Sequence, residues 1–161
     1  MTRAVIAFGA NLGDREATIA AAVREIAEAT GVALVAVSPV YESAAVKDSG
    51  VDDDAPRYLN GVIVVETALA PHALLELLQR IELEHGRERT EHWGDRTLDL
   101  DLIDVDGIVL DDERLVLPHP RASQRAFVLA PWLDIDPDAE LAGHGPIAAL
   151  RAAATDEVVR R

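Results

Sequence analysis

Two acidic residues, Asp99 and Asp101, stand two positions apart in the run L-D-L-D-L at 98–102. Alternate side chains of a β-strand point to opposite faces, so the carboxylates would share one face and the leucines the other. The Cα atoms of the two acids would then lie roughly 6.5 Å apart. That spacing suits carboxylates that hold one or two Mg²⁺ ions, but not an acid pair that shares a proton. The same alternation is common in a strand with one exposed face, so the pair alone is not diagnostic.

The segment just before this strand is rich in arginine. Arg87, Arg89 and Arg96 lie there, with Trp93 among them. A guanidinium group binds phosphate oxygens through two parallel hydrogen bonds. Together with the carboxylate pair, these arginines predict a site for Mg²⁺ and phosphate. Trp93 lies in a polar loop, where it could stack on a flat ligand or fill a gap in the core.

A second set of residues is suited to a planar heterocycle. Tyr58 and Asn60 share one face of a predicted strand, and Phe127 follows closely on Arg125. A carboxamide presents a donor and an acceptor together, and aromatic rings can enclose a flat ring system. Each of these residues is equally compatible with core packing, so the interpretation depends on the combination. His119, between two prolines, is by itself more typical of a local hydrogen-bonding residue than of a catalyst.

The length of 161 residues and a hydrophobic fraction of 49% predict a single domain, residues 1–161, with a sizeable core. The chain contains no cysteine, which excludes disulfides, thiolate metal sites and a cysteine nucleophile. With no long apolar run and no signal peptide pattern, we expect a cytoplasmic protein without a membrane span. The formal net charge of -14 argues against nucleic acid or an anionic membrane as a partner. A phosphate site must therefore depend on local charge, and seven of the 15 Lys and Arg residues lie between positions 80 and 125.

The elements that must position these residues are predicted in the order β-α-β-β-α-β. Asp14 is predicted to cap the first helix, and Pro71 to begin the second. This order predicts an α+β fold with a ferredoxin-like core, an added hairpin strand and C-terminal helices. The two core helices would cover one face of the sheet and leave the other face for loops and ligand. The strands are expected at 3–8, 32–41, 58–67 and 99–105, and the helices at 15–29 and 71–86.

The remaining segments complete the predicted fold. Residues 42–57 are predicted to form a long loop, of a kind that often acts as a lid. Asp106-Gly107 is a hairpin signal, so 108–110 are expected to pair back with the strand before them. Two C-terminal helices are expected at about 123–133 and 147–154. The last residues, D-E-V-V-R-R, are expected to fray.

From its first strand to about Pro137 the sequence resembles the 6-hydroxymethyl-7,8-dihydropterin pyrophosphokinases, also called 2-amino-4-hydroxy-6-hydroxymethyldihydropteridine diphosphokinases. The most specific of the shared motifs is W-G-D-R-T-L-D-L-D-L-I at 93–103. The others occur in the family's order and spacing: G-A-N-L-G-D (9–14), S-P-V-Y-E (38–42), Y-L-N (58–60), Q-R-I-E (79–82), G-R-E-R (86–89), L-P-H-P-R (117–121) and R-A-F-V-L-A-P (125–131).

The resemblance implies an enzyme that transfers pyrophosphate from ATP to the hydroxymethyl group of the dihydropterin in folate biosynthesis, releasing AMP. It implies two Mg²⁺ ions held by Asp99 and Asp101, and a monomer whose partners are the two substrates. Arg87 and Arg96 match residues that contact the transferring phosphates. Positions around ATP are matched by Gln79, Glu82, Arg89, Trp93, Arg114, His119 and Arg125. The pterin side would comprise Ser43, Val46, Tyr58, Asn60, Trp93 and Phe127.

The chain departs from the family at several loop positions. Asp95 stands where the family usually has proline, and His92 where it often has arginine. Ala44-Ala45 replaces a common Pro-Pro pair, and Ala10 replaces a serine. These changes concern the loops around the site, whereas the carboxylate pair is intact.

Two other functions are compatible with part of the pattern. A non-catalytic ferredoxin-like module that binds a small molecule would explain the fold, but not the arginines beside the carboxylates. A metal-dependent nuclease or nucleotidyltransferase would explain the carboxylates. The net charge of -14 and the lack of a basic stripe count against a nucleic-acid substrate for such an enzyme.

Overall fold

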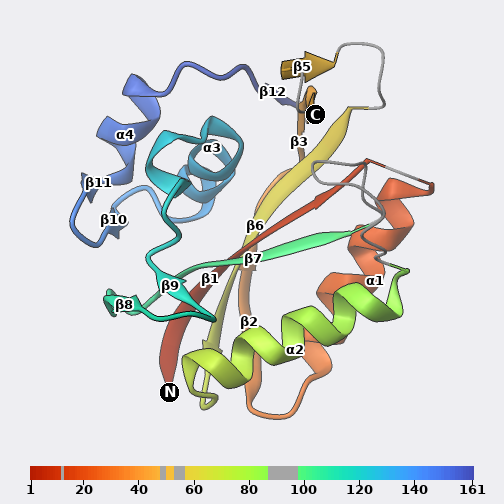
Figure 1. The fold of residues 1–161 in the computed structure, drawn as a ribbon, viewed down its shortest axis with the longest axis vertical. Coiled ribbons are helices and arrows are strands. Elements are labelled where there is room, and N and C mark those ends of the chain that lie inside the picture. Colours follow the sequence, from red (N-terminus) through yellow and green to blue (C-terminus); the bar gives the residue numbers. More distant parts are fainter. Residues whose placement is uncertain (12, 48–49, 53–56, 87–97) are drawn as a thin grey trace.

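Strand β1 (Thr2–Ala10) runs through the middle of the main sheet (Figure 1). It pairs antiparallel with β6 (Tyr58–Thr67) on one side and with β7 (Asp99–Val105) on the other. β2 (Val32–Val37) pairs with the far edge of β6, which gives the order β7-β1-β6-β2. The predicted ferredoxin-like α+β class is confirmed. The computed structural model describes residues 1–11, 13–47, 50–52, 57–86 and 98–161, and of 45–47 and 50–52 only the backbone.

Helices α1 (Arg15–Glu28) and α2 (Pro71–Glu84) cover one face of this sheet, as predicted. The Asp14 side chain caps α1 by accepting a hydrogen bond from the backbone N–H of Ala17 at 3.1 Å. Pro71 lies in the first turn of α2, where a missing N–H leaves no helical bond unmade. The core cluster on this face includes Ile6, Phe8, Ile19, Ile26, Leu59, Ile63, Leu74, Leu78, Leu98, Leu100 and Leu102.

The opposite face of the sheet carries a second core cluster, so the expectation that it would be left to loops and ligand is wrong for most of its length. Helix α3 (Ala126–Ile135) packs on β6, and α4 (Ile147–Ala153) packs on α3. Figure 1 shows both helices on the other side of the sheet from α1 and α2. The end of the face near Gly9 lies outside this cluster, as do Arg3 and Glu66 at the opposite end. The cluster comprises Val5, Ala7, Val62, Val64, Ile103, Ala122, Val128, Leu129, Trp132, Leu141 and Ile147.

Shorter elements connect these layers. These short elements are β8 (Leu110–Asp111), β9 (Val116–Leu117), the 3₁₀ helix η1 (Ala122–Gln124), β10 (Glu140–Leu141) and β11 (Gly145–Pro146).

None of the helices in the described ranges is long and apolar enough to cross a membrane.

The single strand predicted at 32–41 is wrong, because the chain breaks it into β2 and β3 (Tyr41–Ser43). Pro39 lies in the break and has no N–H to contribute to a sheet. The Ser38 hydroxyl accepts the backbone N–H of Val62 at 2.9 Å, which satisfies this group of β6 where the neighbouring strand is interrupted. Both pieces pair with β6, β2 along its second half and β3 along its first.

The prediction of one long loop at 42–57 is also wrong. The segment contains the end of β3 and a two-stranded ribbon formed by β4 (Ala45–Lys47) and β5 (Gly50–Asp52). Each ribbon strand has three residues, which is too few to produce a recognisable alternation of apolar and polar side chains.

The predicted turn at Asp106-Gly107 is confirmed, but its strand pairing is not. The two residues have φ of 47° and 71°, and the N–H of Ile108 donates to the Val105 carbonyl at 2.8 Å. The chain then leaves β7, and β8 pairs with β9 instead. Turn chemistry is local, whereas the choice of strand partner depends on how the following segments pack.

The last residues join the main sheet, so the prediction that they fray is wrong. β12 (Val159–Arg160) pairs with β3. The Tyr41 hydroxyl donates to Oδ2 of Asp134 at 2.5 Å, and Nε of Arg160 lies 3.8 Å from the same oxygen. This anchoring holds the segment between α4 and β12 beside the start of α3, where Asp156 accepts a hydrogen bond.

Candidate active site

Strand β7 presents its two carboxylates on the face that carries α3. Asp99 and Asp101 are each partly buried, while Leu98, Leu100 and Leu102 are buried in the core cluster of the α1–α2 face. The predicted division of this strand into a carboxylate face and a leucine face is confirmed. The carboxylates therefore stand at the end of the sheet that the second core cluster leaves open.

Gly9 separates the metal side of the candidate site from the heterocycle side. In the register of the sheet it is paired with Asp99 of β7 and with Asn60 of β6. Directly paired residues share a face, so Asp99 and Asn60 stand two strand spacings apart, about 10 Å, with only a hydrogen atom between them. A Cβ added at Gly9 would lie 3.3 Å from Oδ1 of Asn60 and 3.6 Å from the Tyr58 ring. The side chains of Asn60 and Tyr58 therefore lie over Gly9, where a larger residue would crowd them.

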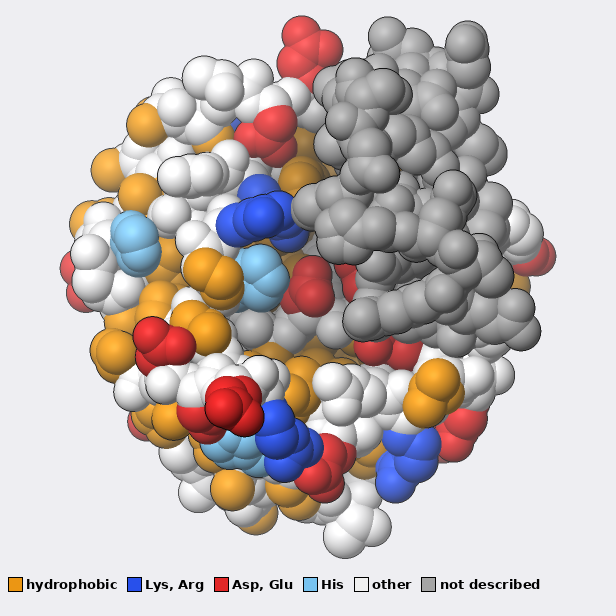
Figure 2. All heavy atoms as spheres, viewed as in Figure 1, with side chains coloured by type: hydrophobic (Ala, Val, Ile, Leu, Met, Phe, Trp, Pro, Cys, Tyr) orange, Lys and Arg blue, Asp and Glu red, His pale blue; other side chains and the backbone are white. Residues whose placement is uncertain are grey.

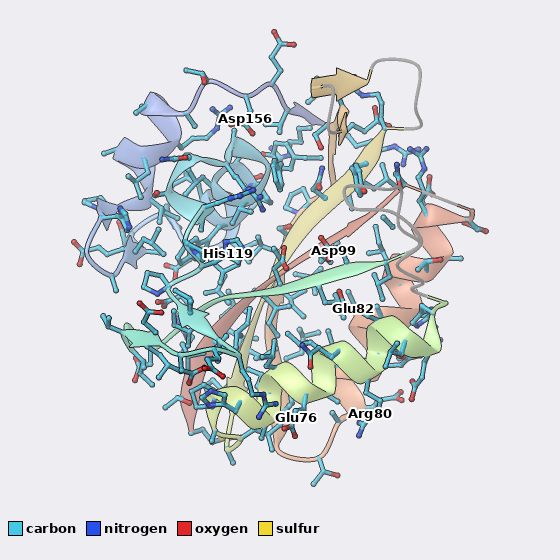
Figure 3. All side chains as sticks on the ribbon, in the orientation of Figure 1. Glu76, Arg80, Glu82, Asp99, His119 and Asp156 are labelled. Atoms are coloured by element: carbon cyan, nitrogen blue, oxygen red, sulfur yellow. The ribbon has the colours of Figure 1, made fainter. Side chains whose placement is uncertain are left out.

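His119 and Arg125 reach the carboxylates from the segment between β9 and α3. Burial, and next the charge of Arg125, lower the pKa of His119 from 6.5 to about 4, while Asp99 acts in the opposite direction. Burial also lowers the pKa of Arg125, against the attraction of Asp101 and Asp99. The four side chains of Asp99, Asp101, His119 and Arg125 therefore lie near enough to one another to interact electrostatically. Figure 3 shows His119 close to Asp99, and Figure 2 shows basic, histidine and acidic side chains gathered on this part of the surface.

The hydrogen bonds of His119 define its tautomer. Its backbone N–H donates to the Ile103 carbonyl at 2.8 Å, which ties this segment to β7. Its Nδ1 accepts the backbone N–H of Arg121 at 3.2 Å, so the neutral ring carries its proton on Nε2. Nε2–H is then available as a donor. The guanidinium carbon of Arg125 lies 5.2 Å from the centre of the Phe127 ring, within the range of a cation–π contact.

On the heterocycle side, Asn60 is held by a neighbouring strand. Its Nδ2 donates to Oγ of Ser43 at 2.7 Å, and both residues are buried. This bond orients the carboxamide so that Oδ1 faces the space beside Gly9. Tyr58 lies one step further along the same face of β6, and Phe127 lies in the first turn of α3. The structure thus brings these residues to the same end of the sheet.

Glu82 has a structural contact at this site. It is 3% exposed, and its Oε2 accepts the backbone N–H of Leu100 at 2.8 Å. Leu100 lies between Asp99 and Asp101 on β7. In the described part of the sheet β7 is an edge strand, so no further strand accepts its outward N–H groups. The carboxylate of α2 therefore fixes β7 at the level of Asp99 and Asp101.

One predicted ATP-side residue, Arg114, is paired elsewhere. Arg114 pairs with Glu76 on α2, with Nη2 and Oε1 2.8 Å apart. Figure 3 shows Glu76 away from Asp99 and His119. Gln79 is exposed on α2, three residues before Glu82. Arg87, Arg89, Trp93 and Arg96 lie outside the described residues, as do Asp95 and His92, and Val46 is described only in its backbone.

Three residues of the assembled site were not predicted as site residues. Predicting Gly9 as a site residue would have required knowledge of the strand register, although Gly9 belongs to a sequence motif shared with the family. Arg121 acts electrostatically on both His119 and Arg125. Asp156 contacts the start of α3 from the segment predicted to fray, so the sequence offered no signal for it.

A cavity of about 720 Å³ lies elsewhere, between α1, β2 and the underlying strands. Its lining is mainly apolar and contains none of the predicted site residues. The carboxylates are the candidate active site because their chemistry, unlike that of the cavity wall, suits a metal–phosphate complex. The residues lining this cavity include Phe8, Ile19, Val23, Leu34, Val37 and Leu59.

The donor set at β7 fits a hard cation that is shared with a ligand. Asp99 and Asp101 offer carboxylate oxygens, and Mg²⁺ is commonly held by one or two carboxylates with water and substrate phosphates completing its coordination. No group of three or more acidic, His or Cys residues that could enclose a metal by themselves is found within the described ranges. The site therefore suits a metal that arrives with a phosphate-bearing substrate.

Protonation of His119 is expected to destabilise the fold. Its pKa is about 4 in the folded state against 6.5 for an ordinary histidine, so the folded protein binds fewer protons between these values. The stability that neutral His119 contributes is fully present above pH 6.5 and is lost as the pH falls to about 4. Urea unfolding between about pH 7 and pH 4 should show a steeper loss for wild type than for His119→Gln. His144→Gln, at an exposed position, should follow wild type, and parallel curves for all three proteins would contradict the burial of His119.

Comparison with known proteins identifies the family. The family profile described as 7,8-dihydro-6-hydroxymethylpterin-pyrophosphokinase matches residues 5–137. A 2-amino-4-hydroxy-6-hydroxymethyldihydropteridine pyrophosphokinase of Pseudomonas aeruginosa is 42% identical over 159 residues, covering 99% of this chain and 96% of that protein. A protein of the same name from Methylorubrum extorquens is 41% identical over 143 residues, covering 89% of this chain and 88% of its own.

The fold likeness agrees with the sequence likeness. A crystal structure of wild-type Plasmodium falciparum HPPK-DHPS superposes with a TM-score of 0.68 at 15% identity, which shows a shared fold. The match covers 95% of this chain but 43% of that longer one. The profile match includes the strands that carry Asp99, Asp101 and Asn60 and the start of α3. The chain therefore belongs to the 7,8-dihydro-6-hydroxymethylpterin-pyrophosphokinase family of enzymes.

Proposed function

We propose that this chain transfers pyrophosphate from ATP to the hydroxymethyl group of 6-hydroxymethyl-7,8-dihydropterin, giving AMP and the dihydropterin diphosphate in folate biosynthesis. Its pyrophosphokinase class follows from the family. The observation that carries the substrate assignment is the placement of Asp99 and Asn60 on either side of Gly9. Carboxylates suited to a metal–phosphate complex and a carboxamide suited to the edge of a heterocycle then face a common space.

In the proposed reaction the hydroxyl oxygen of the pterin attacks the β-phosphorus of ATP. The bond from that phosphorus to the oxygen bridging to the α-phosphate breaks, AMP leaves, and the hydroxyl proton passes to solvent. Asp99 and Asp101 would hold Mg²⁺, two ions in this proposal. Bound metal supplies positive charge to the phosphate oxygens, the principal form of catalysis in phosphoryl transfer.

Arg125 and His119 are proposed to bind ATP. Arg125 forms no salt bridge with a carboxylate in the part of the chain that the structure describes, and a guanidinium group stays charged in proteins. It is therefore available to phosphate oxygens beside Asp101. The Nε2–H of neutral His119 offers one further donor.

The pterin is proposed to lie between Tyr58 and Phe127, with Asn60 at its edge. Ser43 orients the carboxamide, and the backbone near Val46 would border the ring. This arrangement would place the hydroxymethyl group toward Gly9 and the carboxylates.

The other assignments are proposed from the family resemblance. Arg87 and Arg96 would contact the transferring phosphates, and Arg114 would have to leave Glu76 to reach ATP. The net charge of -14 supports a monomeric enzyme of small molecules that binds neither nucleic acid nor an anionic membrane surface. The remaining ATP contacts proposed are Gln79, Glu82, Arg89 and Trp93, the last also bordering the pterin.

The proposal is tested by incubating the protein with ATP, Mg²⁺ and 6-hydroxymethyl-7,8-dihydropterin and measuring AMP. We expect one AMP for each pterin consumed, and none when EDTA removes the metal. The 6-methyl analogue, which lacks the hydroxyl nucleophile, should bind and yield no AMP. If no AMP forms above a pterin-free control, while the pterin still binds by calorimetry, the protein is a non-catalytic binding module.

A further inference from the structure

The start of α3 is capped by a residue from a distant part of the chain. The first N–H groups of a helix have no partner within the helix, and the N-cap residue of α3, Arg125, makes no side-chain capping bond. The N–H of Ala126 instead donates to Oδ1 of Asp156 at 2.8 Å, across 30 residues of sequence. Figure 3 shows Asp156 beside α3, with His119 and Asp99 lying nearer the centre of the sheet.

The second oxygen of this carboxylate lacks a hydrogen-bond partner. Oδ2 of Asp156 is buried and accepts no hydrogen bond from any group that the structure describes. A buried carboxylate oxygen is unfavourable unless a positive charge compensates it. The negative charge of Asp156 attracts the positive charge of Arg125. Asp156 thus acts on α3 in two ways, through the backbone of Ala126 and through the side chain of Arg125.

The segment that carries Asp156 is held at both ends. It follows α4, which packs on α3, and precedes β12, which pairs with β3. A carboxylate fixed in this way can hold the first turn of α3 in one position. That turn carries Arg125 immediately before it and Phe127 within it.

We propose that Asp156 is a positioning residue that orients the Arg125 guanidinium, and the first turn of α3, for ATP. The role rests on the proposed function, in which Arg125 contacts ATP and Phe127 contacts the pterin. Asp156 lies beyond the family match at 5–137, so the tail of the chain contributes to a site whose direct contacts all precede it.

The test is a double-mutant cycle on kcat/KM for ATP. Asp156→Asn keeps an oxygen that can accept the Ala126 N–H and removes the charge. We expect it to raise KM for ATP and lower kcat/KM roughly tenfold, a typical coupling for neighbouring residues, with a smaller change in kcat. In an Arg125→Ala background the same substitution should change kcat/KM less than about twofold. Glu157→Ala removes an exposed acid one position along and should match wild type.

Melting temperatures of all variants separate positioning from loss of stability. Asp156→Ser, which also provides a capping oxygen, repeats the measurement if the asparagine variant does not fold. The role is overturned if Asp156→Asn matches an active wild type, or if it lowers kcat/KM equally with and without Arg125. A wild-type protein that releases no AMP would instead overturn the proposed function, and this role with it.

Discussion

Replacing Asp101 by alanine is expected to lower kcat by about a thousandfold, at the upper end of what a single electrostatic contact contributes to catalysis. Asp101 is one of two carboxylates on the face of β7 that is proposed to hold the metal, and no third acid completes a cluster with them in the described residues. Its loss would leave the phosphate charge poorly neutralised. AMP release over a range of Mg²⁺ concentrations measures the effect, and added metal should not restore the rate.

The fold of this variant should survive, because Asp101 is partly exposed and pairs across the sheet with Ala7 without contributing to the apolar core. Circular dichroism and urea unfolding check this point. Asp138→Ala, which removes an exposed acid from a turn, is the matched control and should retain full activity. Near wild-type turnover by Asp101→Ala would show that the metal is held elsewhere.

Replacing Gly9 by valine is expected to lower kcat/KM about a hundredfold for both substrates, an effect expected when reacting groups are displaced by about 1 Å. The new side chain would occupy the space between Asp99 and Asn60. Even the Cβ alone would lie 3.3 Å from Oδ1 of Asn60, so Gly9→Ala should give an intermediate loss. The backbone should tolerate both changes, because valine is favourable in a strand and Gly9 does not have a positive φ.

Gly61 provides the contrast for this prediction. A Cβ there would lie 2.2 Å from the Phe8 ring in the core, so Gly61→Ala should lower the melting temperature. Gly9→Ala should lower the melting temperature less than Gly61→Ala, because its contact with Asn60 is 3.3 Å and not 2.2 Å. If Gly9→Val remained fully active, the space beside Gly9 would not be part of the reaction site.

The local pattern of the sequence was sufficient for the main elements that carry the site. The alternation in L-D-L-D-L placed Asp99 and Asp101 on one face of a strand and the leucines in the core, and both features are confirmed. The strand at 58–67 and the Asp14 cap were predicted from equally local signals. Such predictions succeed because strand periodicity and capping depend on residues within a few positions of one another.

The structural predictions failed where a segment pairs with, or packs on, a part of the chain that is distant in sequence. The tail forms β12 because β3 offers it an edge, and the second core forms because α3 and α4 pack against a face predicted to be open. None of these partners leaves a periodic signal in the segment that it pairs with.

The sequence by itself determined the types of chemistry available: hard oxygen ligands at Asp99 and Asp101, guanidinium groups nearby, and an amide with aromatic rings for a planar ligand. Only the tertiary structure decided how they are arranged. The register around Gly9 sets the separation of Asp99 from Asn60, and the packing of the C-terminal segment brings Asp156 to the start of α3. The physical reason is that distances between strands and helices depend on long-range pairing and core packing, whereas residue chemistry and strand alternation are local properties of the chain.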